Sequence, residues 1–228
     1  MPASTASAQQ PDGERHPLAY NLAGITTLVL LAAVGIAYVI DQAGRSARTA
    51  GPSLDDGNVV TQTVAGHDLA IPSSWFRFGE DIRPGFVSQV DLNVQLALDG
   101  LPEPASVDVT LMPRSGARAS AVLLDAVYLH QFADETVGGI PGLVGKPLVP
   151  SEGYAGETVW YDPLSPNPFV AKCAEAPEPS RPDRCLRTIH LPNGLAVVQS
   201  FDATVLAAWR QVDDELALWL GQIGALQN

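Results

Sequence analysis

The chain has few cysteines and few basic residues. Its 228 residues include two cysteines, too few for a disulfide-scaffold miniprotein or for an all-cysteine zinc site. Thirteen basic residues against 25 acidic ones leave a formal charge of −12. A nucleic-acid binder needs a basic face to displace counterions from phosphate, so nucleic acid is excluded as the expected partner.

Motifs that mark common active sites are also missing. The serine-nucleophile patterns Gly-x-Ser-x-Gly and Ser-x-x-Lys do not occur. Near Gly145 the sequence departs from a phosphate loop, because Ile140 stands where a glycine is required and Pro147 replaces the Ser/Thr. The histidines lack the i, i+4 spacing of a helical zinc site. We predict no catalytic, cofactor-binding or metal-ligating residue.

One long uncharged stretch is present, from Leu18 to Ile40. At about 1.5 Å rise per residue a helix of this length covers roughly 34 Å, enough for a hydrocarbon core of about 30 Å. Tyr20 and Tyr38 lie near its ends, where tyrosine rings prefer the headgroup level. We predict a single transmembrane helix over residues 18–40, with the lipid bilayer as a partner. A cleaved signal peptide is the alternative, although the apolar run of signal peptides is shorter.

The remaining sequence divides by composition. Residues 1–17 are rich in Ala, Ser, Gln and Pro without an apolar period, which is typical of a disordered tail. Residues 41–57 mix Gly, Pro, Ser and charges and are predicted to be a linker. Residues 58–228 are long enough for one domain with its own core.

Alternating residues predict two long strands in this domain. From Phe86 to Leu98 apolar residues alternate with polar ones at a strict two-residue period, as in a strand with one wet face. A second alternating run follows at Val107, Val109 and Leu111. The connection between the two runs contains an Asp-Gly pair and two prolines, which suits an antiparallel arrangement.

A hairpin turn is predicted at Pro192-Asn193-Gly194, because Asn-Gly tolerates positive φ. Its two strands are Cys185–Leu191 and Leu195–Phe201. We also predict strands over Val59–Val64, His67–Ile71 and Glu157–Tyr161, a helix or a strand over Ala119–Phe132, and a loop over Gly138–Gly145.

The C-terminal segment predicts an amphipathic helix, with Asp202 as its N-cap. Apolar residues spaced by three and four form a stripe that packs on a sheet. The predicted fold class is therefore α+β: a single N-terminal transmembrane helix followed by one antiparallel-sheet domain with one or two packed helices. The stripe consists of Val205, Trp209, Val212, Leu216, Trp219 and Ile223.

The segment Leu69-Ala70-Ile71-Pro72-Ser73-Ser74-Trp75, a strand that ends in Ile-Pro before a tryptophan, resembles the start of PsbP-like α/β/α sandwich domains. A terminal helix after a hairpin is similar to them too. The resemblance covers some twenty residues, implies an architecture and carries no catalytic residue across.

Cys173 and Cys185 enclose eleven residues, three of them proline. We predict a structural disulfide between them, because a cross-link would define a loop that cannot anchor itself in a sheet. A metal site would need more soft ligands nearby, and a redox pair is normally Cys-x-x-Cys. Reduced thiols remain an alternative. A disulfide requires an oxidising compartment.

Trp160, Tyr161 and Phe169 lie close to the cysteine pair in a proline-rich stretch. If exposed, these aromatic side chains would make a rigid recognition surface. The alternative, which we favour, is that Trp160 and Phe169 fill the core.

Eleven arginines against two lysines suggest a GC-rich bacterial genome. Arginines flanking residues 18–40 slightly favour a cytoplasmic C-terminus, whereas the cysteine pair favours the outside. We predict a protein of the bacterial inner membrane that crosses it once, with its C-terminal domain in the periplasm.

The leading functional hypothesis is a membrane-anchored, non-enzymatic binding protein, an accessory or assembly factor of an inner-membrane or envelope complex. Its partner is then another membrane or envelope protein. One alternative is a small-ligand or lipid-binding domain with residues 138–145 as a lid. Another is a hydrolase, for which His130 or His190 must meet an acid and a serine in one cleft.

Overall fold

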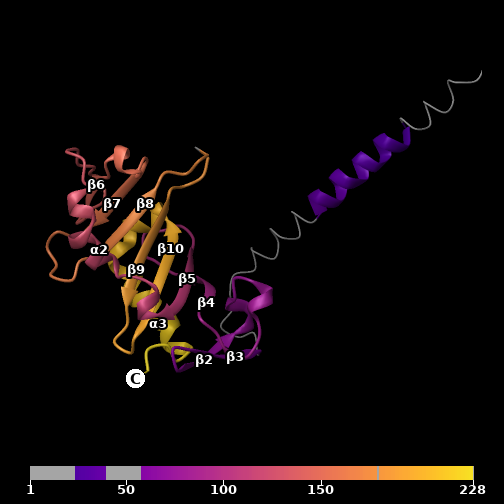
Figure 1. The fold of residues 1–228 in the computed structure, drawn as a ribbon, viewed down its shortest axis with the longest axis horizontal. Helices are drawn as coiled ribbons and strands as arrows, with labels where there is room; N and C mark the ends of the chain where they lie inside the picture. The colour runs from indigo at the N-terminus through magenta and orange to yellow at the C-terminus, as the bar shows by residue number, and fades with distance from the viewer. Residues whose placement is uncertain (1–23, 40–57, 179, 228) are drawn as a thin grey trace, which may run out of the picture. The chain divides into compact units, whose positions relative to one another are not determined.

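The computed structural model describes residues 24–39, 58–178 and 180–227 (Figure 1). The chain divides into two compact units, Met1–Ala50 and Gly51–Asn228, and each is described by itself. The described part of the first unit is a helix over residues 24–39. The predicted tail over 1–17 and the predicted linker over 41–57 lie outside the described residues.

The predicted transmembrane helix over residues 18–40 is not supported. Among the described residues, no helix has both the length and the apolar character needed to cross a membrane. Residues 18–23 and 40 lie outside the described part. The prediction of a single transmembrane helix is therefore wrong, and the described residues give no support for the bilayer as a partner.

The second unit contains a three-stranded and a seven-stranded sheet. The small sheet consists of β1 (Val59–Val64), β2 (His67–Pro72) and β3 (Gly85–Phe86). The large sheet consists of β4 (Val90–Leu96), β5 (Ala105–Pro113), β6 (Val144–Pro147), β7 (Glu157–Tyr161), β8 (Val170–Ala174), β9 (Arg184–His190) and β10 (Leu195–Asp202). The helices are α2 (Ser120–Ala126) and α3 (Trp209–Gln222), with short 3₁₀ helices that include Tyr128–His130 and Ala203–Ala208.

All neighbours in the large sheet are antiparallel, in the order β4-β5-β10-β9-β8-β7-β6. The small sheet has the order β2-β1-β3, with β1 and β3 parallel. An antiparallel sheet with a few helices confirms the α+β part of the prediction. The strands β6 and β8 were not predicted. β6 lies partly inside the glycine-rich segment expected to be a loop.

The predicted hairpin between β9 and β10 forms, and a second hairpin joins β1 to β2. Ala65 and Gly66 join β1 to β2 with φ of 51° and 88°, as the turns that favour hairpins require. In the β9–β10 turn, Gly194 alone takes a positive φ, 90°. Asn193 instead uses its side-chain amide to donate to the backbone oxygen of Ala225, over 2.9 Å. The hairpin thereby holds the C-terminal segment.

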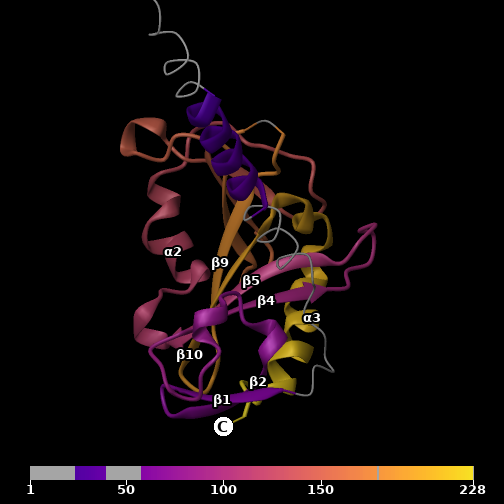
Figure 2. The same cartoon turned by 90° about the vertical axis from the view of Figure 1, so that its right-hand side faces the viewer.

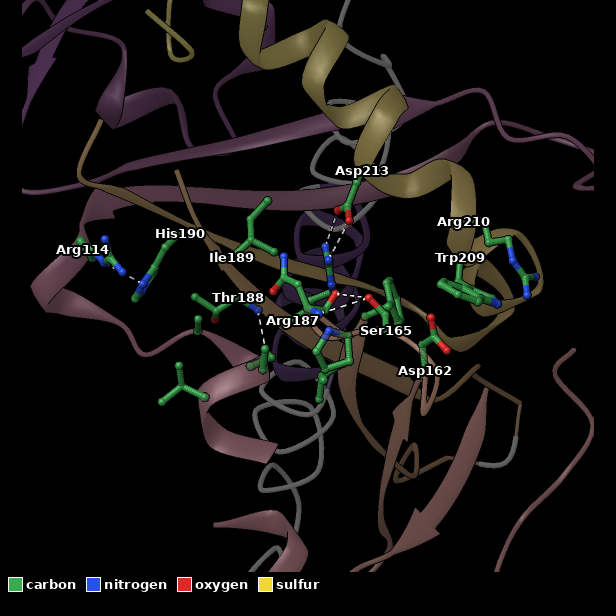
Figure 3. Close-up of a pocket in the computed structure, with 18 residues that line it drawn as sticks. Arg114, Asp162, Ser165, Arg187, Thr188, Ile189, His190, Trp209, Arg210 and Asp213 are labelled. Atoms are coloured by element: carbon green, nitrogen blue, oxygen red, sulfur yellow. Dashed lines mark hydrogen bonds and ion pairs between the residues drawn. The ribbon is translucent and has the colours of Figure 1, made fainter. Parts of the chain in front are cut away.

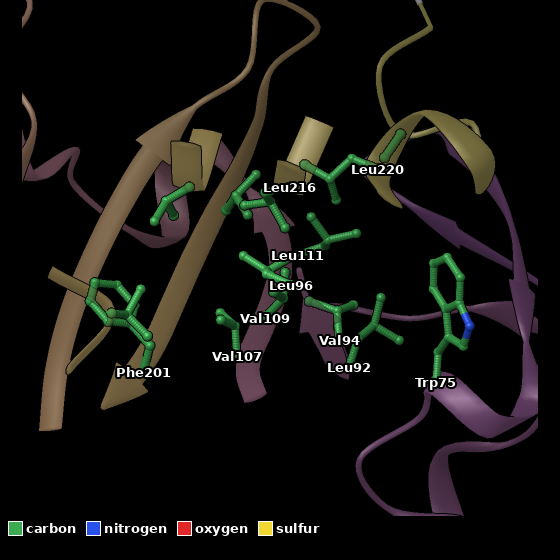
Figure 4. Close-up of a cluster of buried hydrophobic side chains, with 14 of the residues drawn as sticks. Trp75, Leu92, Val94, Leu96, Val107, Val109, Leu111, Phe201, Leu216 and Leu220 are labelled. Atoms are coloured by element: carbon green, nitrogen blue, oxygen red, sulfur yellow. The ribbon is translucent and has the colours of Figure 1, made fainter. Parts of the chain in front are cut away.

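The alternation in β4 and β5 is confirmed. Their inward side chains form the floor of the main core, beneath Leu216 and Leu220 of α3 (Figure 4). Their outward side chains bond to one another: the Thr110 hydroxyl donates to Asp91 over 2.5 Å, and the Asn93 amide donates to Asp108 over 2.8 Å. One face of this half of the sheet is therefore apolar and covered, and the other is polar.

The predicted C-terminal stripe is also confirmed, since four of its residues are buried in the main core and both tryptophans pack against it. Trp219 contacts Trp75 with ring centroids 4.7 Å apart. Asp202 occupies the predicted N-cap position, but its carboxylate makes no capping bond. It accepts instead from the Arg184 guanidinium over 2.7 Å.

α2 lies on the face of the sheet opposite α3 (Figure 2). The segment predicted as helix or strand is thus helical, and it forms a second, smaller core. Leu124 and Tyr128 pack there with Leu148, Val159 and Val170. The sheet therefore carries a helix on each face, while the resemblance to PsbP-like domains stays a prediction.

The predicted disulfide between Cys173 and Cys185 is present. The two residues are direct partners in the β8–β9 pairing, and both are buried. Disulfides persist in oxidising compartments, so this bond is typical of an extracytoplasmic domain.

Removal of the disulfide should destabilise the domain. Cys173→Ser with Cys185→Ser is expected to lower the free energy of unfolding by about 3 kcal/mol, because the unfolded chain regains the freedom of the closed loop. Urea denaturation measures the change. Reduced wild type should match the variant, and the variant should not respond to reductant. Two free thiols in unfolded, unreduced wild type would contradict the bond.

Tyr128 gives the domain an alkaline limit. Burial raises the pKa of the Tyr128 phenol above its ordinary 10.0, and the negative charge of Glu157 and the nearby Tyr154 raise it further. The folded state therefore holds this proton more tightly than the unfolded state does. Its contribution to stability is present below pH 10 and is lost as the pH rises through the raised pKa.

Tyr128→Phe should therefore lose less stability than wild type between about pH 8 and about pH 11. Urea denaturation at the two pH values makes the comparison. An equal alkaline loss in both proteins would show that Tyr128 is not the responsible group.

Candidate functional site

The large sheet opens between β8 and β9. The two strands pair at three positions only, from Ala174 opposite Arg184 to Lys172 opposite Leu186. Beyond these pairs lies a pocket of about 530 Å³ (Figure 3). Its walls come from β9, from the segment before β8 and from the first residues of α2 and α3. The disulfide therefore lies within the short β8–β9 pairing, and the pocket begins where this pairing ends.

Arg187 of β9 lies at one wall of the pocket. Its side chain is 6% exposed and donates to both carboxylate oxygens of Asp213 in α3, over 2.5 and 2.8 Å. Its guanidinium also lies 4.5 Å from the centre of the Phe169 ring. A buried cation is costly unless it is paired and hydrogen-bonded, so this ion pair holds β9 to α3.

Aromatic rings extend this wall. Phe169 contacts Trp209 with ring centroids 5.4 Å apart, and the Arg210 guanidinium lies 4.3 Å from the centre of the Trp209 ring. The Trp209 indole N–H and the Arg210 guanidinium both donate to the backbone oxygen of Pro141, over 3.1 and 3.2 Å. The start of α3 is therefore fixed by bonds to the glycine-rich loop.

The opposite wall is built around His190 and α2. Arg114 donates to Nδ1 of His190 over 2.9 Å, and Nε2 lies 2.8 Å from the backbone oxygen of Ala117. Because a guanidinium can only donate, Nδ1 is the acceptor and Nε2 carries the proton. The Ser120 hydroxyl accepts the backbone N–H of Thr188 over 2.9 Å.

These bonds bear on the hydrolase alternative. His190, Ser120 and two acids, Asp162 and Asp213, do line one pocket. However, both ring nitrogens of His190 bond to Arg114 and to a backbone oxygen rather than to a serine or an acid. His130 is not among the lining residues. The arrangement therefore lacks the base–nucleophile contact that a serine hydrolase needs.

The predicted lid over residues 138–145 does not cover the pocket, because none of its residues lines it. Leu143 is buried in the main core and Ile140 packs against it. Gly142 has a φ of 85°, and a Cβ there would lie 2.1 Å from the Arg210 guanidinium. The loop is packed down over filled core, which removes the support for a small-ligand site beneath it.

The predicted recognition residues do not form one surface. Trp160 packs against the main core, whereas Tyr161 packs against the smaller core and stacks on Phe132 at 5.9 Å. Neighbouring strand residues point to opposite faces, which explains the separation. Phe169 is buried and lines the pocket. Of the three, Phe169 alone belongs to the candidate site.

Sequence reasoning missed Arg187, Trp209 and Asp213 as site residues. One signal was available: Arg187 stands between Cys185 and Ile189, at an inward position of an alternating strand. A charged residue at such a position requires a partner from another element.

The pocket differs from the rest of the chain in its charge. The lining residues include three arginines, Arg114, Arg187 and Arg210, against two acids, in a chain of formal charge −12. Two apolar side chains beside the pocket are exposed: Val122, which lines it, is 54% exposed, and Leu164, between the lining residues Asp162 and Ser165, is 90% exposed. The pocket is therefore locally cationic and has apolar side chains at its mouth.

No family model and no curated protein matches the chain. Among solved structures, it is similar to Smlt3025, an immunity protein of the Stenotrophomonas maltophilia type IV secretion system. The TM-score is 0.49 and the sequence identity is 10%, with 77% of this chain and 98% of that chain covered. A similarity of this degree carries no conclusion about the partner or activity of this chain.

The Arg187–Asp213 pair gives a direct test of the site's construction. Asp213→Asn should lower the free energy of unfolding by about 2–3 kcal/mol, because the Arg187 cation stays buried without its counter-charge. We expect less than for a fully buried pair, because Asp213 is half exposed. Asp214→Asn, the matched control on the same helix, should change stability by no more than about 0.5 kcal/mol. Equal effects of the two variants in urea denaturation would contradict this role.

Proposed function

We propose that this chain is a non-enzymatic binding protein of the bacterial envelope. It works in the periplasm as an accessory or assembly factor, and it binds another envelope protein through the pocket between β8 and β9. The observation that carries the proposal is the combination of a fixed cationic pocket with an exposed apolar rim.

The bonding inside the pocket supports binding rather than catalysis. Arg187 and Asp213 satisfy each other, and His190 uses both nitrogens in holding Arg114 and Ala117. Groups bonded in this way keep the shape of a site. A pre-formed shape lowers the ordering cost of association.

The rim supports a protein partner. Val122 lines the pocket from α2 and is 54% exposed, whereas Leu164 lies in the segment between the lining residues Asp162 and Ser165 and is 90% exposed. Apolar side chains beside a concave site are typical of surfaces that a partner covers.

Site-specific photocrosslinking in the native host tests this function. A benzophenone amino acid in place of Leu164 should give a covalent adduct with one other envelope protein when the cells are irradiated. The matched control is the same replacement at Leu218, which is 61% exposed on α3 and, unlike Leu164, is not flanked in the sequence by residues that line the pocket.

We expect the adduct at Leu164 and not at Leu218. The proposal is overturned if Leu164 gives no adduct, or if both positions give the same adducts, since the pocket would then not be the binding surface.

A further inference from the structure

The backbone of β9 has an open edge inside the pocket. The N–H of Leu191 donates to the oxygen of Leu195 at the end of the β9–β10 pairing, over 2.8 Å. Antiparallel strands alternate between residues that bond the partner strand and residues that point away from it. From Leu191 backward, Ile189 and Arg187 therefore bond β10, whereas His190 and Thr188 direct their backbone groups away from β10 and toward β8.

β8 does not meet these groups, because its pairing with β9 stops at Lys172 and Leu186. The N–H of Thr188 takes the hydroxyl of Ser120 as its acceptor instead. The Ser120 hydroxyl therefore accepts the hydrogen bond that a carbonyl oxygen of a neighbouring strand accepts elsewhere in the sheet. By the same alternation, the backbone oxygen of Thr188 and both backbone groups of His190 point away from β10, on the side of the pocket that these two residues line.

We propose that the partner inserts an extended acidic segment into this opening and pairs it with the edge of β9 at Thr188 and His190. This inference rests on the proposed function and names the class of segment that the site takes. Addition of a strand to an open edge is a general mode of peptide recognition, in which backbone bonds give affinity and alternate side chains give specificity.

The two walls suit an extended segment. Alternate residues of an added strand point to opposite faces of the sheet. On one face they would meet Phe169 and Trp209, and on the other Ala121 and Val122 of α2. Both sides offer apolar contact, so the segment has room for apolar side chains as well as acidic ones.

Charge complementarity makes the segment acidic. Asp213 is already paired with Arg187, and Asp162 accepts the backbone N–H of Leu164 over 3.0 Å. The Arg114 side chain donates to His190, and the Arg210 side chain donates to the backbone oxygen of Pro141. A guanidinium has five N–H donors, so both arginines retain donors for a carboxylate.

The probe is a fluorescein-labelled heptapeptide of alternating valine and glutamate residues, titrated into the full chain. Two control peptides accompany it: one with lysine in place of glutamate, and one with N-methyl groups on alternate backbone nitrogens along one edge. We expect saturable binding of the acidic peptide, with each control at least about tenfold weaker. Hydrogen exchange of the His190 amide should slow when the acidic peptide binds.

Matched arginine variants locate the contact. Arg210→Gln should weaken binding of the acidic peptide about tenfold, and Arg210→Lys should keep part of the affinity. Arg181→Gln is the control, because Arg181 lies outside the pocket and pairs with Glu178 on an exposed loop. Urea denaturation of each variant confirms that the fold is retained.

Equal affinities for the acidic and lysine peptides would show that the site does not select acidic residues. An unchanged affinity after N-methylation would show that no strand is added. Either result, or no saturation up to about 1 mM, would overturn the proposal. If Leu164 still crosslinks to a partner in that case, the proposed function stands and the mode of binding is different. If the crosslink also fails, the proposed function fails with it.

Discussion

The ion pair between Arg187 and Asp213 is the contact on which the site depends. It joins β9 to α3 beside the place where β9 loses its neighbour β8. Asp213 supplies the counter-charge and Phe169 a ring face, so the arginine can stay buried while its strand has one open edge. Without this ion pair, the part of β9 that is not paired with β8 would have fewer contacts to keep it in register.

The disulfide acts at the other end of the same opening. Cys173 and Cys185 cross-link β8 to β9 within their short pairing, and this pairing connects a four-stranded half of the sheet to a three-stranded half. One half packs mainly under α3, and the other also carries the smaller core under α2. The cross-link therefore keeps two differently packed halves in one sheet while the pocket between them stays open.

Local patterns in the sequence were enough to predict the elements that are determined by residues close together in the chain. The alternation in β4 and β5, the Asn193-Gly194 turn and the stripe of α3 all depend on near neighbours in the chain, and all are confirmed. The cysteine pair was predicted for the same reason, since twelve positions separate its members. The prediction of a transmembrane helix over residues 18–40 failed, because an uncharged run in the sequence does not by itself establish a membrane-spanning helix.

The site could not be predicted in this way. Arg187 and Asp213 are 26 positions apart, and Ser120 meets Thr188 across 68 positions. β6 and β8 are short and interrupted by glycine, lysine or alanine, so the sequence does not show that β8 ends its pairing early. The opening of the sheet results from the register of two strands, which only the assembled fold defines.

The contrast between the chain and its pocket limits the kind of partner. Unit charges are screened over about 8 Å at physiological ionic strength, so an approaching protein first meets the field of an acidic chain of formal charge −12. At the pocket, Arg114 and Arg210 supply positive charge. A partner that is acidic over its whole surface would be repelled before contact. The bound segment is therefore a local acidic strand on a protein that is otherwise neutral or basic, and its recognition depends on short-range pairing rather than on long-range attraction.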